Sequence, residues 1–399
     1  MSYYAIILFL IFAAACDGNN NSSKPGTVTP VVILPPEKPE PVVKAVKKIW
    51  SLNDFYSNDK ALAAMVDSIY SKLSPAGKAS QMIMIATSEY KGIGVPFPMA
   101  FKLYISGITG SVLFLKGRRK EFAREIALLN KASKEHKMIP PVFACDCEPS
   151  LFHKKFTDAD SLTPAAFLTS VQDVRQMALL ISAEMKKMGI HWNFAPVADI
   201  SENKEIIDTR SFGDNDSAVV EKSIAFIKAT ENNGVATSVK HFPGHGAVKG
   251  DSHKNLVYID SAFRELDNFS VILQKGNPIS VMVGHIAVRN IPGQYTDGLP
   301  ATLSEKLVTG LLKDSIGFKG IVITDAMNMK AVKNIDNAGW KAVMAGNDLV
   351  LIPEKIEELH QKIMKFLAGN SKIAKRLSVS IKKIIRLKIC LGLFNNSLN

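Results

Sequence analysis

The segment KHFPGHGAVKGDSH, residues 240–253, joins the end of an apolar stretch to a loop rich in titratable side chains. Pro243 and Gly244 prevent a helix or an unbroken strand here, because proline lacks an N–H and glycine has little conformational preference. The preceding residues, 234–239, have the pattern of a short apolar strand. A loop that carries three histidines, an aspartate and two lysines is more typical of a chemical site than of a structural turn.

Short apolar runs like this one recur along the chain, separated by amphipathic stretches such as 171–188 and 304–314. The runs are 81–86, 111–115, 142–145, 192–196, 236–240, 280–283, 320–324 and 348–352. Eight strand–helix units within roughly 270 residues favour a closed barrel over an open doubly wound sheet. No Gly-x-Gly-x-x-Gly follows the first run, which argues against a dinucleotide-binding fold. The predicted fold is therefore an α/β (β/α)8 TIM-type barrel forming a single catalytic domain, residues 47–399.

Polar side chains follow five of these runs, at the end where each predicted strand finishes. They are Asp146, Asp199, the Lys240-His241 pair, His285 and Asp325. In a barrel of parallel strands, these ends and the loops after them meet at one mouth, where active sites are built. We therefore expect the chemistry of the chain at this mouth.

Asp325 follows the seventh run directly and has two interpretations. It can cap a helix that begins at the next residues, since aspartate is a preferred N-cap. With a second titratable loop opposite, a nucleophilic carboxylate is the better interpretation.

His253 and Asp251 form a pair two residues apart on the loop. Histidine titrates near neutral pH and can both donate and accept a proton, and a neighbouring aspartate can orient the ring and favour its cationic form. We interpret the pair as an acid/base group; a purely structural loop remains the alternative.

Metal binding is the other interpretation of this loop. Its candidate ligands are His241, His245, Asp251 and His253. Pro243-Gly244 keeps the first two histidines off one helical face, and no glutamate lies between them as in zincins. We expect neither a metal nor an organic cofactor.

The N-terminus has the pattern of a targeting segment. Residues 5–15 are apolar, too few to span a bilayer, and end in Ala-Ala-Ala before Cys16, after which polarity rises. This resembles a bacterial lipobox and predicts a signal peptide at 1–15 and a lipidated Cys16; a secreted protein and an uncleaved anchor are the alternatives. Residues 16–46 contain six prolines and predict an extended tether. The expected location is the bacterial cell envelope, with a lipid anchor in a membrane.

The chain is basic, with a net charge of +12 and a pI of about 9.3 over 399 residues. Its lysines are scattered and no nucleic-acid-binding motif is present, so we expect no nucleic-acid partner. A cationic amphipathic stretch at 371–393 is expected to pack on the barrel rather than to lie on a membrane surface.

Residues 240–253 resemble the signature of the β-N-acetylhexosaminidase branch of glycoside hydrolase family 3. Further matches are NFAPVAD at 193–199, RSFG at 210–213, VGHI at 283–286, PATLS at 300–304 and TDAM at 324–327. The resemblance covers roughly residues 70–393 and implies a retaining glycosidase. It makes Asp325 the nucleophile, His253 the acid/base and Asp251 its partner. It also implies carbohydrate as the partner, and we expect a monomer.

The resemblance also implies which residues bind sugar hydroxyls: Asp146, Arg210, Lys240 and His241. Rim salt bridges are the alternative for the last three. The family usually has Asp-Gln-Glu-Gly-Gly after the third strand and then an arginine, whereas residues 146–150 here read DCEPS, with Lys154 expected in the place of the arginine. Lysine offers a point charge where arginine offers a planar fork, so we expect an altered substrate range.

Two functions compete with hydrolysis of terminal GlcNAc from peptidoglycan fragments or chitooligosaccharides. One is a phosphorylase on the same fold, since a neutral histidine does not repel phosphate as a second carboxylate would. The other is a tethered glycan-binding protein that has lost catalysis.

Overall fold

Eight parallel strands form the central sheet, in the order β10-β1-β2-β3-β4-β5-β7-β9. The computed structural model describes residues 48–369 and 371–394, so the predicted signal segment 1–15, Cys16 and the whole predicted tether at 16–46 lie outside the described residues, as does residue 47. The strands are β1 (Ile83–Thr87), β2 (Ser111–Phe114), β3 (Val142–Cys145), β4 (Trp192–Asn193), β5 (Ala236–Phe242), β7 (Ser280–Val283), β9 (Ile321–Thr324) and β10 (Val350–Leu351).

The sheet closes on itself. β10 pairs with β1 on one side, and a parallel bridge between Ile323 and Leu349 links its other side to β9. All eight strands overlap the predicted apolar runs, which read as apolar because both faces of the strands are buried. The (β/α)8 barrel is confirmed.

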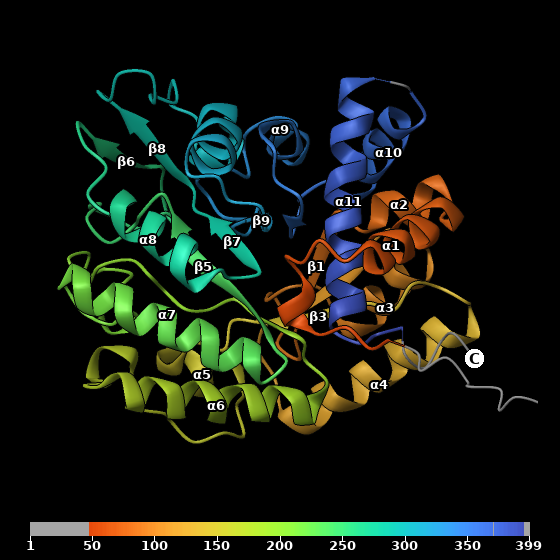
Figure 1. Cartoon of the computed structure of the whole chain (residues 1–399), viewed down its shortest axis with the longest axis horizontal. Helices are drawn as coiled ribbons and strands as arrows, with labels where there is room; N and C mark the ends of the chain where they lie inside the picture. The colour runs from red at the N-terminus through yellow and green to blue at the C-terminus, as the bar shows by residue number, and fades with distance from the viewer. Residues whose placement is uncertain (1–47, 370, 395–399) are drawn as a thin grey trace, which may run out of the picture. The chain divides into compact units, whose positions relative to one another are not determined.

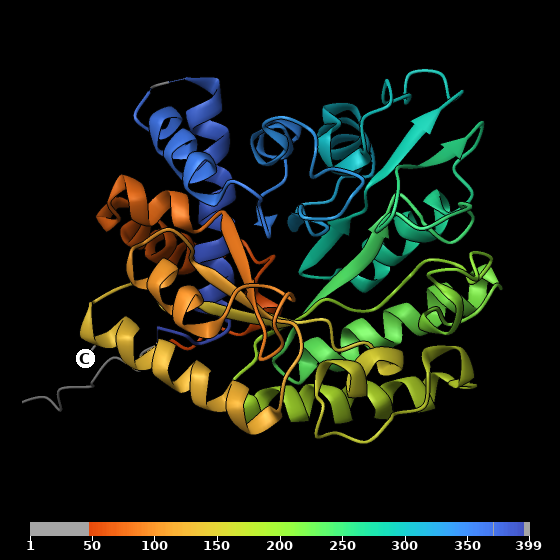
Figure 2. The ribbon, with the colours of Figure 1, turned by 180° about the vertical axis from the view of Figure 1, so that it is seen from behind.

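Helices surround the strands (Figure 1), and the view from behind shows the same arrangement (Figure 2). The longer helices are α1 (Lys60–Lys72), α2 (Pro75–Ser80), α3 (Phe97–Ile105), α4 (Arg119–Glu135), α6 (Val171–Met188), α7 (Asp216–Asn232), α8 (Leu266–Gly276), η6 (Lys306–Ser315), α9 (Ala338–Ala345), α10 (Ile356–Leu367) and α11 (Lys372–Cys390). Short helical turns are η1 (Leu52–Asp54), η2 (Pro149–Leu151), α5 (Phe152–Lys155), η3 (Ala165–Phe167), η4 (Asp208–Arg210) and η5 (Ala301–Leu303).

Local signals set the ends of α6, which matches the prediction at both ends. Ser170 and Asp173 form a capping box at its start, and Gly189 ends it with φ of 84°. The helix predicted at 304–314 is present as η6, two residues later at its start and with wider π-type turns.

Helix α11 packs on the barrel, as expected for the cationic C-terminal stretch. It buries most of one face, including Ile381 and Ile384. Its Lys388 is fully buried and donates to Gln81 Oε1 at 2.5 Å and to the Gly110 carbonyl at 3.1 Å, next to the starts of β1 and β2. The amino group of Lys388 is therefore enclosed within the fold rather than presented on a surface.

Two short strands lie outside the barrel and were not predicted. β6 (Val257–Asp260) and β8 (Ile286–Arg289) form a separate parallel pair, seen beyond β5 and β7 at the upper left of Figure 1. β6 directly follows the loop after β5, so this pair fixes the far end of the loop. Among the described residues, no helix is both long and apolar enough to cross a bilayer.

Candidate active site

A cavity of about 640 Å³ opens at the carboxyl ends of the strands. It is lined by Asp146 after β3, by Lys240 and His241 at the end of β5, by His253 on the following loop, and by Asp325 after β9. The barrel thus brings together side chains from distant parts of the chain, as the positions of these residues at strand ends predict.

Asp325 does not cap a helix. Its Oδ1 accepts the N–H of Ala326 at 2.7 Å, but the residues that follow form turns, and α9 begins only at Ala338. Its own N–H donates to the carbonyl of Val283, which ties it to the end of β7. The capping interpretation is wrong, and the carboxylate is left at the cavity.

The surroundings keep Asp325 ionised. Burial on its own raises the pKa of a carboxyl group, but His285, His241 and His253 outweigh burial and lower the pKa of Asp325 below its ordinary value. His285 is itself held by Thr302 and by the Ala326 carbonyl. A carboxylate that is anionic at neutral pH is suited to attack an electrophilic carbon.

His253 and Asp251 are paired on the loop. The Asp251 Oδ1 accepts both the N–H of His253, at 2.8 Å, and its ring Nδ1–H, at 2.8 Å. The His253 side chain is 57% exposed and faces the cavity, whereas that of Asp251 is only 14% exposed. Burial raises the pKa of Asp251, but the His253 contacts outweigh it and lower that pKa. With Nδ1 engaged, Nε2 is the nitrogen left for proton transfer.

Asp199 holds the start of the same loop. It is fully buried, and its carboxylate accepts from the N–H of His241 and of His245, at 3.1 and 2.8 Å, and lies 2.6 Å from His241 Nδ1. This fixes His241 in the cavity wall. The sequence placed Asp199 at the mouth but gave no sign of this anchoring role.

Five charged groups that line the same cavity form a network. Lys240 Nζ lies 2.8 Å from Asp146 and 2.6 Å from Glu148. Arg210 forms a bidentate salt bridge with Glu148, in which Nε and Nη2 each lie 2.8 Å from a carboxylate oxygen. Lys155 Nζ lies 3.2 Å from Asp146 Oδ2. Burial raises the pKa of Glu148, but the cations Arg210 and Lys240 outweigh it and bring it to about 2. The salt bridges proposed as alternatives for Arg210 and Lys240 are therefore present, and these groups also line the cavity.

Lys154 does not reach the cavity, which corrects one prediction. It is exposed, whereas the next residue, Lys155, is half-buried, lines the cavity and contacts Asp146. Both lie on α5, a single helical turn, and neighbouring residues on a helix point about 100° apart. Glu148 was also missed, because its partners Arg210 and Lys240 are distant in sequence.

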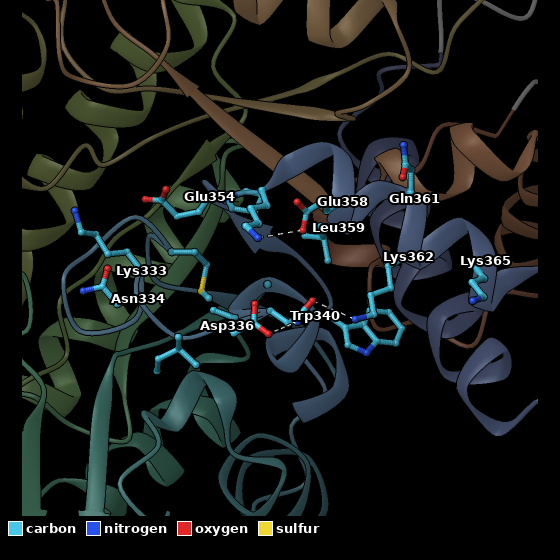
Figure 3. Close-up of a pocket in the computed structure, with 17 residues that line it drawn as sticks. Lys333, Asn334, Asp336, Trp340, Glu354, Glu358, Leu359, Gln361, Lys362 and Lys365 are labelled. Atoms are coloured by element: carbon cyan, nitrogen blue, oxygen red, sulfur yellow. Dashed lines mark hydrogen bonds and ion pairs between the residues drawn. The ribbon is translucent and has the colours of Figure 1, made fainter.

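A second cavity, of about 540 Å³, lies beside the first. Lys333 lines both. Figure 3 shows Lys333 and Asn334 at one end of it and Trp340 and Lys362 towards the other. The Trp340 ring stacks on Phe366 with centroids 4.6 Å apart, so it is held in a fixed orientation.

The residues of the loop do not form a metal site. Within residues 48–369 and 371–394, no three His, Cys, Asp or Glu side chains are grouped so as to hold an ion. The rings of His241 and His253 instead contact Asp199 and Asp251, and the ring of His245 contacts Ser252.

The sequence is similar to those of known proteins. Residues 107–387 match the family model described as glycosyl hydrolase family 3 N terminal domain. β-Hexosaminidase A of Pseudoalteromonas piscicida is 30% identical over 239 residues, which is 53% of this chain and 40% of that protein. The chain thus spans less than half the length of this relative.

Solved structures agree on the fold. A family 3 β-N-acetylglucosaminidase of Paenibacillus sp. strain FPU-7 has a TM-score of 0.71 at 25% identity, covering 80% of this chain and 63% of that chain. A β-glucoside phosphorylase bound to 2FGlc has a TM-score of 0.75 at 22% identity, covering 85% and 63%, which bears on the fold alone. Because the family model matches well over half of the chain, the chain belongs to glycosyl hydrolase family 3.

Proposed function

We propose that this protein is a retaining β-N-acetylhexosaminidase that removes terminal β-linked GlcNAc from glycans. The observation that carries the proposal is the cavity shared by Asp325 and His253, with Asp251 bonded to the histidine. The similarity to a β-hexosaminidase and to a β-N-acetylglucosaminidase of the same family supports GlcNAc as the sugar.

The proposed reaction has two displacements. In the first, a carboxylate oxygen of Asp325 bonds to the anomeric carbon, the glycosidic C–O bond breaks, and His253 Nε2–H protonates the departing oxygen. In the second, neutral His253 takes a proton from water as its oxygen attacks the same carbon and releases Asp325. Asp251 stabilises the histidine cation that exists before the first proton transfer and again after the second, which fits the lowered pKa of that carboxyl.

The charged network is proposed to bind the sugar hydroxyls. Asp146, Lys155 and Lys240 present acceptors and donors at the cavity and are fixed by one another. Charge-assisted hydrogen bonds of this kind fix the orientation of the ring relative to the nucleophile.

The second cavity gives a longer glycan room to extend past Lys333. Its lining mixes charged and amide side chains with the flat ring of Trp340, a combination that suits sugar hydroxyls and sugar faces. Chitooligosaccharides and peptidoglycan fragments are the proposed natural substrates.

Turnover of aryl glycosides tests the proposal. Aryl-β-GlcNAc is expected to be cleaved far better than aryl-β-glucoside or aryl-β-xyloside, with β-configured GlcNAc as the first product by NMR. If none of the three aryl glycosides is cleaved, the proposal is contradicted and a glycan-binding protein is favoured. Binding of a chitooligosaccharide without its cleavage then identifies such a protein.

A phosphorylase is the second candidate. In it phosphate instead of water attacks the glycosyl-Asp325, and the cavity offers Lys155, Lys330 and Lys333 as cations near the nucleophile. Adding phosphate to the same assay separates the two, since a phosphorylase yields GlcNAc 1-phosphate and a hydrolase yields free GlcNAc.

Export and anchoring are proposed from the sequence at Cys16. The proposal is that lipid on Cys16 holds the barrel at a membrane of the cell envelope through the proline-rich tether. Metabolic labelling with an alkyne fatty acid tests it: label is expected on the wild-type protein and not on Cys16→Ser, and equal label on both contradicts it.

A further inference from the structure

The base of the loop after β5 is fixed by a second buried carboxyl group. Glu265, which precedes α8, accepts the N–H groups of Gly246, Ala247 and Ile200 at 2.9, 3.2 and 2.7 Å. Gly246 is packed so closely that a Cβ would lie 2.0 Å from the carbonyl oxygen of Ile200. The loop therefore leaves from a rigid point at Ala247.

The tip of the loop is held in a different way, by side chains. His245 Nε2 lies 2.9 Å from the Ser252 hydroxyl, and the Asn203 Nδ2 donates to the Gly250 carbonyl at 2.9 Å. His245 and Ser252 are both 1% exposed, in contrast to the exposed His253 next along the chain. The tip is thus tied back to the base of the same loop.

The direction of the His245–Ser252 hydrogen bond follows from the neighbours of the ring. The Asn203 Oδ1 accepts the N–H of Glu205, so its Nδ2 is the atom that lies 3.3 Å from His245 Nδ1. An amide NH2 only donates, so Nδ1 accepts and Nε2 carries the proton. Burial lowers the pKa of His245, which keeps the ring neutral in this form. His245 Nε2–H therefore donates to Ser252 Oγ.

Ser252 lies between Asp251 and His253, the proposed acid/base pair, in the sequence. We propose that the His245–Ser252 hydrogen bond is a latch that holds the Asp251–His253 pair over the candidate catalytic cavity. The inference rests on the proposed function and deepens it, with His245 and Ser252 as positioning residues that do not touch the substrate.

The loop has room to leave this position when the latch is absent. A cavity of about 670 Å³ lies against its tip and β6, lined in part by Lys249, Gly250, Asp251 and Asn255. Without the Ser252 hydroxyl, the Asn203–Gly250 contact is the one remaining hydrogen bond to residues 249–253 from a side chain outside the loop, among the described residues. Loss of the latch should therefore displace the acid/base pair while leaving Asp325 in place.

The leaving group of the substrate provides the test. A 2,4-dinitrophenyl group departs without protonation, whereas a 4-methylphenyl group needs the general acid, whose contribution is typically about 10²–10⁴-fold. For Ser252→Ala in the full chain, we expect kcat/KM to fall at least about tenfold on 4-methylphenyl-β-GlcNAc and less than about threefold on the dinitrophenyl glycoside. The ratio of the two values is unaffected by the fraction of protein that folds.

Three comparisons complete the test. Ser252→Thr, which retains a hydroxyl, should restore the wild-type ratio; Ser217→Ala, an exposed helical serine, should leave it unchanged. Adding Ser252→Ala to His253→Ala should change the ratio no further, because both act on one step. The latch proposal is overturned if Ser252→Ala loses kcat/KM equally on both substrates or loses none. It is also overturned if the effects of the two substitutions on the ratio add in the double variant. If the wild-type protein cleaves neither of the two substrates, the proposed function is overturned instead.

Discussion

Asp325 and His253 line one cavity of about 640 Å³, although one follows β9 and the other lies on the loop after β5. The barrel brings the two residues together from different strand ends, and the loop is anchored to the barrel through Asp199 and Glu265. The site therefore combines the proposed nucleophile, at a strand end, with the proposed acid/base group, on an anchored loop.

Replacing the nucleophile should remove activity without unfolding the protein. Asp325→Ala is expected to lower kcat on aryl-β-GlcNAc by at least about 10⁴-fold, since the covalent route is lost. Asp314→Asn, an exposed aspartate with the same kind of charge loss, should stay within about twofold of wild type. Circular dichroism of both variants should match wild type. Residual activity above one hundredth of wild type in Asp325→Ala contradicts the assignment.

The neighbouring lysines on α5 form a matched pair. Lys155→Ala is expected to lower kcat/KM about tenfold, because it removes a charged contact to Asp146, which is proposed to bind sugar hydroxyls. Lys154→Ala, on the exposed side of the same turn, should change it less than about twofold. Steady-state kinetics on aryl-β-GlcNAc measures both, and the reverse order of effects would restore Lys154 as the sugar contact.

Trp340 tests whether longer glycans use the second cavity. Trp340→Ala should reduce kcat/KM for chitotetraose by about tenfold, since stacking of an aromatic side chain contributes about 0.5–1.5 kcal/mol beyond its burial. Aryl-β-GlcNAc, which is too short to reach the ring, should be unaffected. A parallel loss on both substrates would mean that Trp340 supports the fold rather than the glycan.

Lys388 gives the fold a pH dependence. Burial lowers its pKa to about 7 from 10.5, so between these values the unfolded chain binds one more proton than the folded protein. Stability should therefore rise with pH across this window, by at most about 1.4 kcal/mol per pH unit from this group. Urea unfolding at pH 7, 8 and 9 should show a smaller rise in Lys388→Met. The same slope in both proteins would mean that Lys388 stays charged when buried.

Much of the fold could be predicted from the sequence, because buried parallel strands leave continuous apolar runs. The positions of Asp325, His253 and Asp146 at the mouth follow from the same runs. The choice between Lys154 and Lys155 could not be made, since it depends on the rotation of one helical turn. The role of Glu265 depends on contacts with Gly246 and Ile200 that only folding creates.

The strands β6 and β8 were missed for a related reason. Each has four residues, and β6 alternates buried and exposed side chains where the barrel strands are continuously buried. Their pairing with each other depends on the loop between β5 and β6, whose path the sequence does not specify.

Mass spectrometry of a trapped intermediate tests directly whether Asp325 forms a covalent bond to the sugar. The protein is incubated with a 5-fluoro-β-GlcNAc fluoride, which slows release of the glycosyl-enzyme, then digested and sequenced. We expect one added fluoro-GlcNAc on the peptide containing Asp325 and none in Asp325→Ala. A covalent adduct on any other residue, or turnover of the reagent with no adduct and an inverted product, would contradict it.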